Sequence, residues 1–85
     1  MIKQWQAKAV LNTHKWGVQS METVCLCMTE ELGELAQAIL QYKQEGGTLD
    51  RITEELADLG ALCFQMVDSF EDAKKRRAEC IEAVG

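Results

Sequence analysis

The feature that most restricts the fold of this chain is its lack of proline, combined with apolar residues that recur three and four positions apart. That spacing places apolar side chains on one face of an α-helix. No segment shows the alternating pattern of a β-strand, so the chain is predicted to be all-α. A first helix is expected over residues 2–13, and Trp16-Gly17 interrupts its pattern.

Two long helices are predicted on either side of Gly46-Gly47, which ends the first of them. Ser20 is a suitable N-cap for this helix, whose apolar stripe runs from residue 21 to residue 39. The next helix can start at Thr48 or Asp50. Because the connection is short, the two helices should form an antiparallel hairpin.

A short fourth helix is expected after the hairpin. Ser69-Phe70-Glu71-Asp72 has the form of a capping box, which predicts a helix from there to about Val84. The fold class is therefore an antiparallel helical hairpin with short flanking helices, in a single domain spanning residues 1–85. A domain of this size buries only roughly 60% of its unfolded surface. We therefore expect a homodimer or homotetramer, in which pairing of chains completes a four-helix bundle.

Charge and hydropathy exclude several classes of protein. The net charge of −5 disfavours a nucleic-acid partner, since such proteins need a basic face to displace counterions. No apolar run approaches the ~20 residues needed to cross a membrane. The segment Met1–Gln6 lacks the layout of a secretion signal, and the four cysteines are not spaced for zinc, so a cytoplasmic protein with reduced thiols is expected.

Two acidic motifs carry the functional signal. They are Glu30-Glu31-Leu32-Gly33-Glu34 on the first long helix and Glu55-Leu56-Ala57-Asp58 on the next. At 100° per residue, Glu31 lies roughly 70° from the centre of its apolar stripe and Glu34 about 60° further round. On the next helix, Glu55 lies at the edge of the apolar stripe and Asp58 lies one turn beyond it. In an antiparallel hairpin these edges can face each other, which brings four carboxylates together beside the core.

Such a cluster is costly without a cation. Two like charges ~4 Å apart repel by about 4 kcal/mol at an effective dielectric constant of 20. Either some of the carboxylates are protonated or a metal ion lies among them. Oxygen ligands without histidine or cysteine favour a hard ion such as Mg²⁺ or Mn²⁺. Each motif alone is more simply explained as a solvated helix face, but the two at matched positions on adjacent helices favour a metal site.

Glu-Glu-x-x-Glu followed after about twenty residues by Glu-x-x-Asp resembles the signature of the MazG-like, all-α nucleoside triphosphate pyrophosphatases. The stretch Glu30–Ile39 and the segment Lys15–Gln19 are also similar to parts of these proteins. The resemblance implies hydrolysis of a (d)NTP to its monophosphate and pyrophosphate. It further implies a catalytic group of Glu30, Glu31 and Glu34, with Glu30 as a further ligand or as the carboxylate that orients the attacking water. The implied Mg²⁺ ligands are Glu31, Glu34, Glu55 and Asp58.

The residues expected to contact the nucleotide lie outside the two acidic motifs. Trp16 can stack on the nucleobase while Gln19 reads its edge, or Trp16 can simply cap the core near a helix junction. Lys74 and Lys75, in the basic run that ends at Arg77, can neutralise phosphates or form a solvated face.

Two other functions fit parts of the sequence. A non-catalytic helical interaction module could keep this fold and bind a protein partner. A carboxylate-bridged di-iron bundle would need Glu-x-x-His pairs, and His14, the only histidine, lies outside both acidic motifs.

Overall fold

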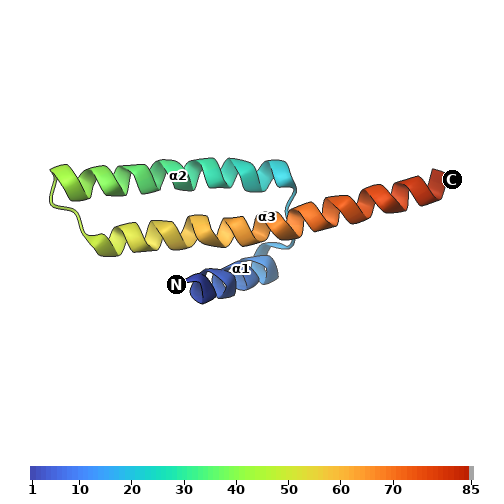
Figure 1. Cartoon of the computed structure of the whole chain (residues 1–85), viewed down its shortest axis with the longest axis horizontal. Coiled ribbons are helices and arrows are strands. Elements are labelled where there is room, and N and C mark those ends of the chain that lie inside the picture. The colour runs from blue at the N-terminus through green and yellow to red at the C-terminus, as the bar shows by residue number, and fades with distance from the viewer. Residues whose placement is uncertain (85) are drawn as a thin grey trace.

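The computed structural model describes residues 1–84 and contains three α-helices (Figure 1). They are α1 (Ile2–Trp16), α2 (Met21–Gln44) and α3 (Leu49–Val84). No strand occurs among these residues, which confirms the all-α prediction. None of the helices over the described range is long and apolar enough to cross a membrane.

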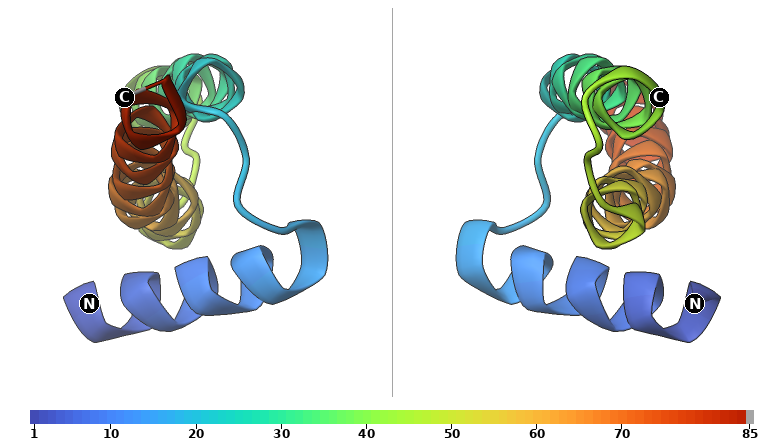
Figure 2. Two further views of the ribbon diagram at one scale, coloured as in Figure 1. Left: turned by 90° about the vertical axis from the view of Figure 1, so that its right-hand side faces the viewer. Right: turned by 90° about the vertical axis from the view of Figure 1, so that its left-hand side faces the viewer.

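The long helices α2 and α3 form the predicted antiparallel hairpin, and α1 packs against α3. Viewed along the hairpin, α1 lies across α3 instead of running parallel to it (Figure 2). The C-terminal part of α3 continues well past the start of α2 and has no neighbouring helix there (Figure 1). The molecule is accordingly elongated, with extents of 61 × 21 × 18 Å.

Local chemistry explains where the helices begin and end. The hydroxyl of Ser20 accepts a hydrogen bond from the Thr23 amide at 3.1 Å, which confirms Ser20 as the N-cap of α2. The Gly46-Gly47 pair follows α2, and Gly46 has a φ of 71°, a left-handed conformation that glycine adopts without steric cost. Thr48 accepts from the Arg51 amide at 3.3 Å and so caps α3.

The expected fourth helix does not exist as a separate element, because α3 is continuous from Leu49 to Val84. Ser69 lies inside this helix, is only 3% exposed, and donates its hydroxyl to the Gln65 carbonyl at 3.0 Å. A serine that bonds back to the carbonyl four residues earlier does not cap a new helix. Asp72, the other half of the expected capping box, pairs instead with Arg76 one turn later at 3.0 Å.

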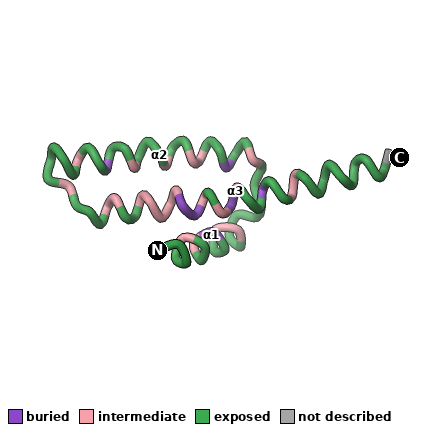
Figure 3. Tube along the Cα trace, in the orientation of Figure 1, coloured by how far each residue is buried: buried purple, intermediate pink, exposed green. Residues whose placement is uncertain are grey.

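The core of the single chain is thin and built from small side chains. Its buried apolar residues are Ala9, Val24, Ala38 and Ala61, and no large side chain of the described chain is fully buried. Figure 3 shows most of the buried positions on α3, the helix that packs against both α1 and α2. The Trp5 ring lies directly over Gly60, which is buried, so α1 approaches α3 most closely there.

The contact between Trp5 and Gly60 gives a test of how α1 is held. A Cβ added at Gly60 would lie 2.4 Å from two atoms of the Trp5 ring, so Gly60→Ala should displace α1 and lower the free energy of unfolding by about 1–3 kcal/mol. Urea unfolding followed by circular dichroism measures this loss.

The matched control is Gly33→Ala, since nothing lies within 4 Å of a Cβ added at Gly33. Alanine in an exposed helix interior should raise stability by roughly 0.5–1 kcal/mol. Equal stability changes in the two variants would show that Trp5 does not pack on Gly60.

Candidate metal centre and adjoining pocket

The hairpin brings three glutamates together. One carboxylate oxygen from each of Glu31, Glu34 and Glu55 lies within 4.8 Å of the other two. Glu31 and Glu34 are three residues apart on α2 and therefore share one side of that helix. Glu55 reaches them from α3 because the antiparallel arrangement sets the early turns of α3 beside the middle of α2.

Two oxygens of this cluster are buried without any partner. Glu31 Oε2 and Glu55 Oε2 are shielded from solvent, and no group of the described residues donates a hydrogen bond to them. A buried polar atom left unpaired costs about 1–3 kcal/mol, and more if it is charged. The two atoms therefore require a proton or a cation.

The pKa values of the two carboxyls reflect this environment. Burial raises the pKa of Glu31 to about 7, and the negative charges of Asp58, Glu34 and Glu55 add to the effect. Burial is also the main cause that raises the pKa of Glu55. A hydrogen bond with the Glu31 carboxyl opposes this rise, while Glu34 and Asp58 add to it. Desolvation and like charges both disfavour the ionised form, so the cluster tends to hold protons when no cation is present.

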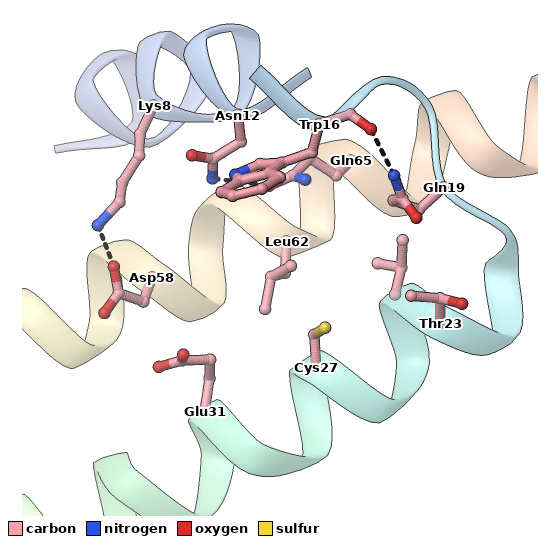
Figure 4. A pocket seen from close by; sticks show the side chains of 11 residues that line it. Lys8, Asn12, Trp16, Gln19, Thr23, Cys27, Glu31, Asp58, Leu62 and Gln65 are labelled. Carbon is pink, nitrogen blue, oxygen red and sulfur yellow. Dashed lines mark hydrogen bonds and ion pairs between the residues drawn. The ribbon is translucent and has the colours of Figure 1, made fainter. Parts of the chain in front are cut away.

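Asp58 lies beside the three glutamates and interacts with a side chain of α1. Its Oδ1 accepts a hydrogen bond from the Nζ of Lys8 on α1, which forms an ion pair (Figure 4). It is not a member of the group of three, although its charge acts on Glu31 and Glu55. Glu30 is exposed on α2 and also lies outside the group. Its role with the attacking water stays a prediction.

A pocket of about 500 Å³ adjoins the carboxylates and is bounded by all three helices and the α1–α2 connection. Glu31 and Asp58 project into one end of it, and Trp16 and Gln19 lie at the other (Figure 4). The Gln19 side chain donates to the Trp16 carbonyl at 2.5 Å, which ties the connection to the end of α1. The pocket is lined by Lys8, Asn12, Trp16, Gln19, Thr23, Val24, Cys27, Glu31, Asp58, Leu62 and Gln65.

The predicted nucleotide contacts fall in two different places. Trp16 and Gln19 line the pocket, and Trp16 is 66% exposed, so part of its ring is free to contact a ligand. Lys74 and Lys75 are exposed on the part of α3 that extends past α2, and they do not line the pocket. Within one chain, the basic run is therefore not brought to the carboxylates.

Sequence reasoning identified Trp16 of α1 but missed the contribution of Lys8 and Asn12 from the same helix to the pocket. Besides the Lys8 ion pair, the Asn12 amide donates to the side-chain oxygen of Gln65 at 3.0 Å, which links α1 to α3. Lys8, Asn12 and Trp16 are each four residues apart and so share one face of α1. This spacing was available in the sequence as a signal, but nothing in it showed which helix that face would meet.

The donor set fits a hard divalent cation. It consists of carboxylate oxygens only, two of them buried and unpaired, and it contains no thiolate or imidazole that would favour a softer metal. Glu31, Glu34 and Glu55 are the residues that can hold such an ion, with Asp58 next to them.

The raised pKa of Glu31 gives a pH-dependence test in protein kept free of metal by a chelator. Between the ordinary value of 4.5 and about 7, the folded state binds more protons than the unfolded state, so the free energy of unfolding should fall as pH rises through this window. Glu31→Gln cannot ionise, and its stability should fall less over the same range. Urea unfolding at several pH values between 4 and 8 measures the difference.

The matched control for this test is Glu30→Gln, which changes the exposed neighbour and should retain the wild-type slope. Addition of Mg²⁺ should oppose the loss of stability near neutral pH, because a cation stabilises the ionised carboxylates. Identical slopes for wild type and Glu31→Gln would show that Glu31 ionises without a penalty.

Comparison with known proteins matches the site to a family. A family model described as the MazG nucleotide pyrophosphohydrolase domain matches residues 19–82, which include both acidic motifs and all of α2. No curated protein and no solved structure matches the chain significantly. The matched region covers well over half of the 85 residues and contains the three clustered glutamates. The chain therefore belongs to the MazG nucleotide pyrophosphohydrolase domain family.

Proposed function

We propose that the protein is a Mg²⁺-dependent pyrophosphohydrolase that converts a (d)NTP and water into the monophosphate and pyrophosphate. One observation carries this proposal: the buried, unpaired oxygens of Glu31 and Glu55 lie in a three-carboxylate cluster at the end of a pocket of about 500 Å³. Family membership supports the same reaction class. A volume of this size lies within the range of small-ligand pockets.

In this proposal Glu31, Glu34 and Glu55 hold Mg²⁺, or Mn²⁺ in its place, and Asp58 completes the ligand set. The bound ion would offset phosphate charge and favour ionisation of water. Glu30, the exposed residue that precedes Glu31 in α2, would orient the attacking water and accept its proton. The water oxygen forms a bond to the α-phosphorus, the bond from that phosphorus to the bridging oxygen breaks, and pyrophosphate leaves with that oxygen.

The other end of the pocket suits the nucleobase. The partly exposed Trp16 ring offers a surface for stacking, and Gln19 beside it offers an amide for the base edge. This orientation would place the phosphates toward Glu31 and Asp58 (Figure 4). The base and the phosphates would thus be held by opposite ends of one pocket.

We also propose that the chain acts as a homodimer or homotetramer. Large apolar side chains remain on its surface, including Leu11, Leu26, Leu40 and Phe70, each more than half exposed. A second chain that covered these surfaces would supply the burial that the thin core lacks. In such an assembly, Lys74 and Lys75 on the extended part of α3 would contact the phosphates of a nucleotide bound to the neighbouring subunit.

A cytoplasmic location belongs to the same proposal, because exposed thiols such as those of Cys25, Cys63 and Cys80 suit a reducing compartment.

The exposed apolar surface favours a second candidate, a non-catalytic interaction module that keeps the family fold. Such a module would use the surface to bind a partner and would have no need of the ion. The two candidates are distinguished by whether the protein releases pyrophosphate from a nucleotide.

The function is tested with a panel of ribo- and deoxyribonucleoside triphosphates in the presence of Mg²⁺. At least one should yield its monophosphate and pyrophosphate, and a chelator should abolish the release. Pyrophosphate and orthophosphate are quantified separately. Orthophosphate as the first product would exclude attack at the α-phosphorus, and no product with any nucleotide would favour the interaction module.

The metal ligands are tested by Glu34→Gln. Loss of one carboxylate ligand should reduce turnover by roughly two orders of magnitude or more, while the folded state keeps or gains stability because a repulsive charge is removed. Steady-state rates and urea unfolding are compared with those of Glu45→Gln, an exposed glutamate outside the cluster at the end of α2. Full activity in Glu34→Gln would place the ion elsewhere.

A further inference from the structure

Lys8 occupies an unusual position in the pocket. It lies in the middle of α1, and its side chain reaches across to α3, where Nζ pairs with Asp58 (Figure 4). Of the described residues that line the pocket, Lys8 is the only one with a cationic side chain. It lies at the same end of the pocket as Glu31.

The charges at this end of the pocket are unbalanced. Glu31 and Asp58 line it, and Glu34 and Glu55 lie against Glu31, so four carboxylates face a single ammonium group. Such an end would repel a triphosphate unless positive charge were added. Lys74 and Lys75 do not line the pocket, which leaves Lys8 as the side chain of the same chain that can provide that charge.

The ion pair with Asp58 also leaves N–H donors of Lys8 available to bind a ligand. An ammonium group has three N–H donors, and the described structure engages one of them, at Asp58 Oδ1. The pair fixes a long and otherwise flexible side chain beside the carboxylate cluster, which reduces the entropy lost when a ligand binds. Lysine acts on phosphate as a point charge with freely oriented donors, so it does not need a preset geometry.

We propose that Lys8 binds the triphosphate of the substrate, with Asp58 holding its ammonium group next to the carboxylate cluster of Glu31, Glu34 and Glu55. The inference rests on the proposed function and deepens it by assigning the phosphate-binding cation. That cation comes from α1, which precedes the matched family region at residues 19–82. The α1 helix is then part of the substrate site, and Asp58 has two roles, as a ligand of the ion and as the ion-pair partner of Lys8.

The test measures binding of inorganic tripolyphosphate in the presence of Mg²⁺ by calorimetry, with binding of Mg²⁺ alone measured in parallel. Lys8→Met should weaken tripolyphosphate binding about tenfold or more, the effect of losing one charge-assisted hydrogen bond. Its affinity for Mg²⁺ alone should be unchanged or higher, because a competing positive charge is removed. Lys8→Arg should restore most of the tripolyphosphate affinity.

The matched control is Lys3→Met, which removes an exposed lysine of α1 that does not line the pocket and should leave both affinities as in wild type. If Lys8→Met behaves like Lys3→Met, Lys8 is only an ion-pair partner and the inference is wrong. Loss of both Mg²⁺ and tripolyphosphate binding in Lys8→Met would show that Lys8 acts by docking α1, which also overturns it. A wild-type protein that binds no tripolyphosphate and hydrolyses no nucleotide would instead refute the proposed function.

Discussion

The mutual approach of Glu31, Glu34 and Glu55 between two antiparallel helices is the constraint on which the rest of the site depends. Their carboxylate oxygens lie within 4.8 Å of one another, and two oxygens are buried without a partner. A folded protein tolerates this only by protonating the carboxyls or by binding a cation. In the proposed function, the same electrostatic cost that opposes the metal-free fold would be the source of the affinity for a divalent ion.

The position of α1 converts this cluster into a pocket. Because Gly60 has no side chain, the Trp5 ring can lie directly on α3 and bring the whole of α1 close to the hairpin. The Lys8–Asp58 pair and the Asn12–Gln65 hydrogen bond then join the two helices along one face. Since α1 crosses the hairpin, a cavity stays open between it and α2, with charge at one end and Trp16 at the other (Figures 2 and 4).

Much of the fold could be predicted because it rests on local chemistry. The Ser20 cap and the glycines that follow α2 act on neighbouring residues, and the structure has both. The separate fourth helix was a wrong prediction, because the local pattern at Ser69 is compatible with two structures. The Ser69 hydroxyl can cap a new helix or donate a hydrogen bond to the carbonyl four residues earlier, and the neighbouring residues do not decide between these two roles. Burial of Ser69 within α3 favoured the second option.

The sequence by itself determined the helical class, the hairpin and the carboxylates that face each other across it, because helical periodicity fixes which residues share a face. It also carried the signature of the MazG nucleotide pyrophosphohydrolase domain family, which the family match confirms. Only the tertiary structure decided that Asp58 pairs with Lys8 and that α1 closes one side of the pocket. Those contacts join residues about fifty positions apart, and their geometry depends on the crossing of α1 over Gly60, which no local pattern specifies.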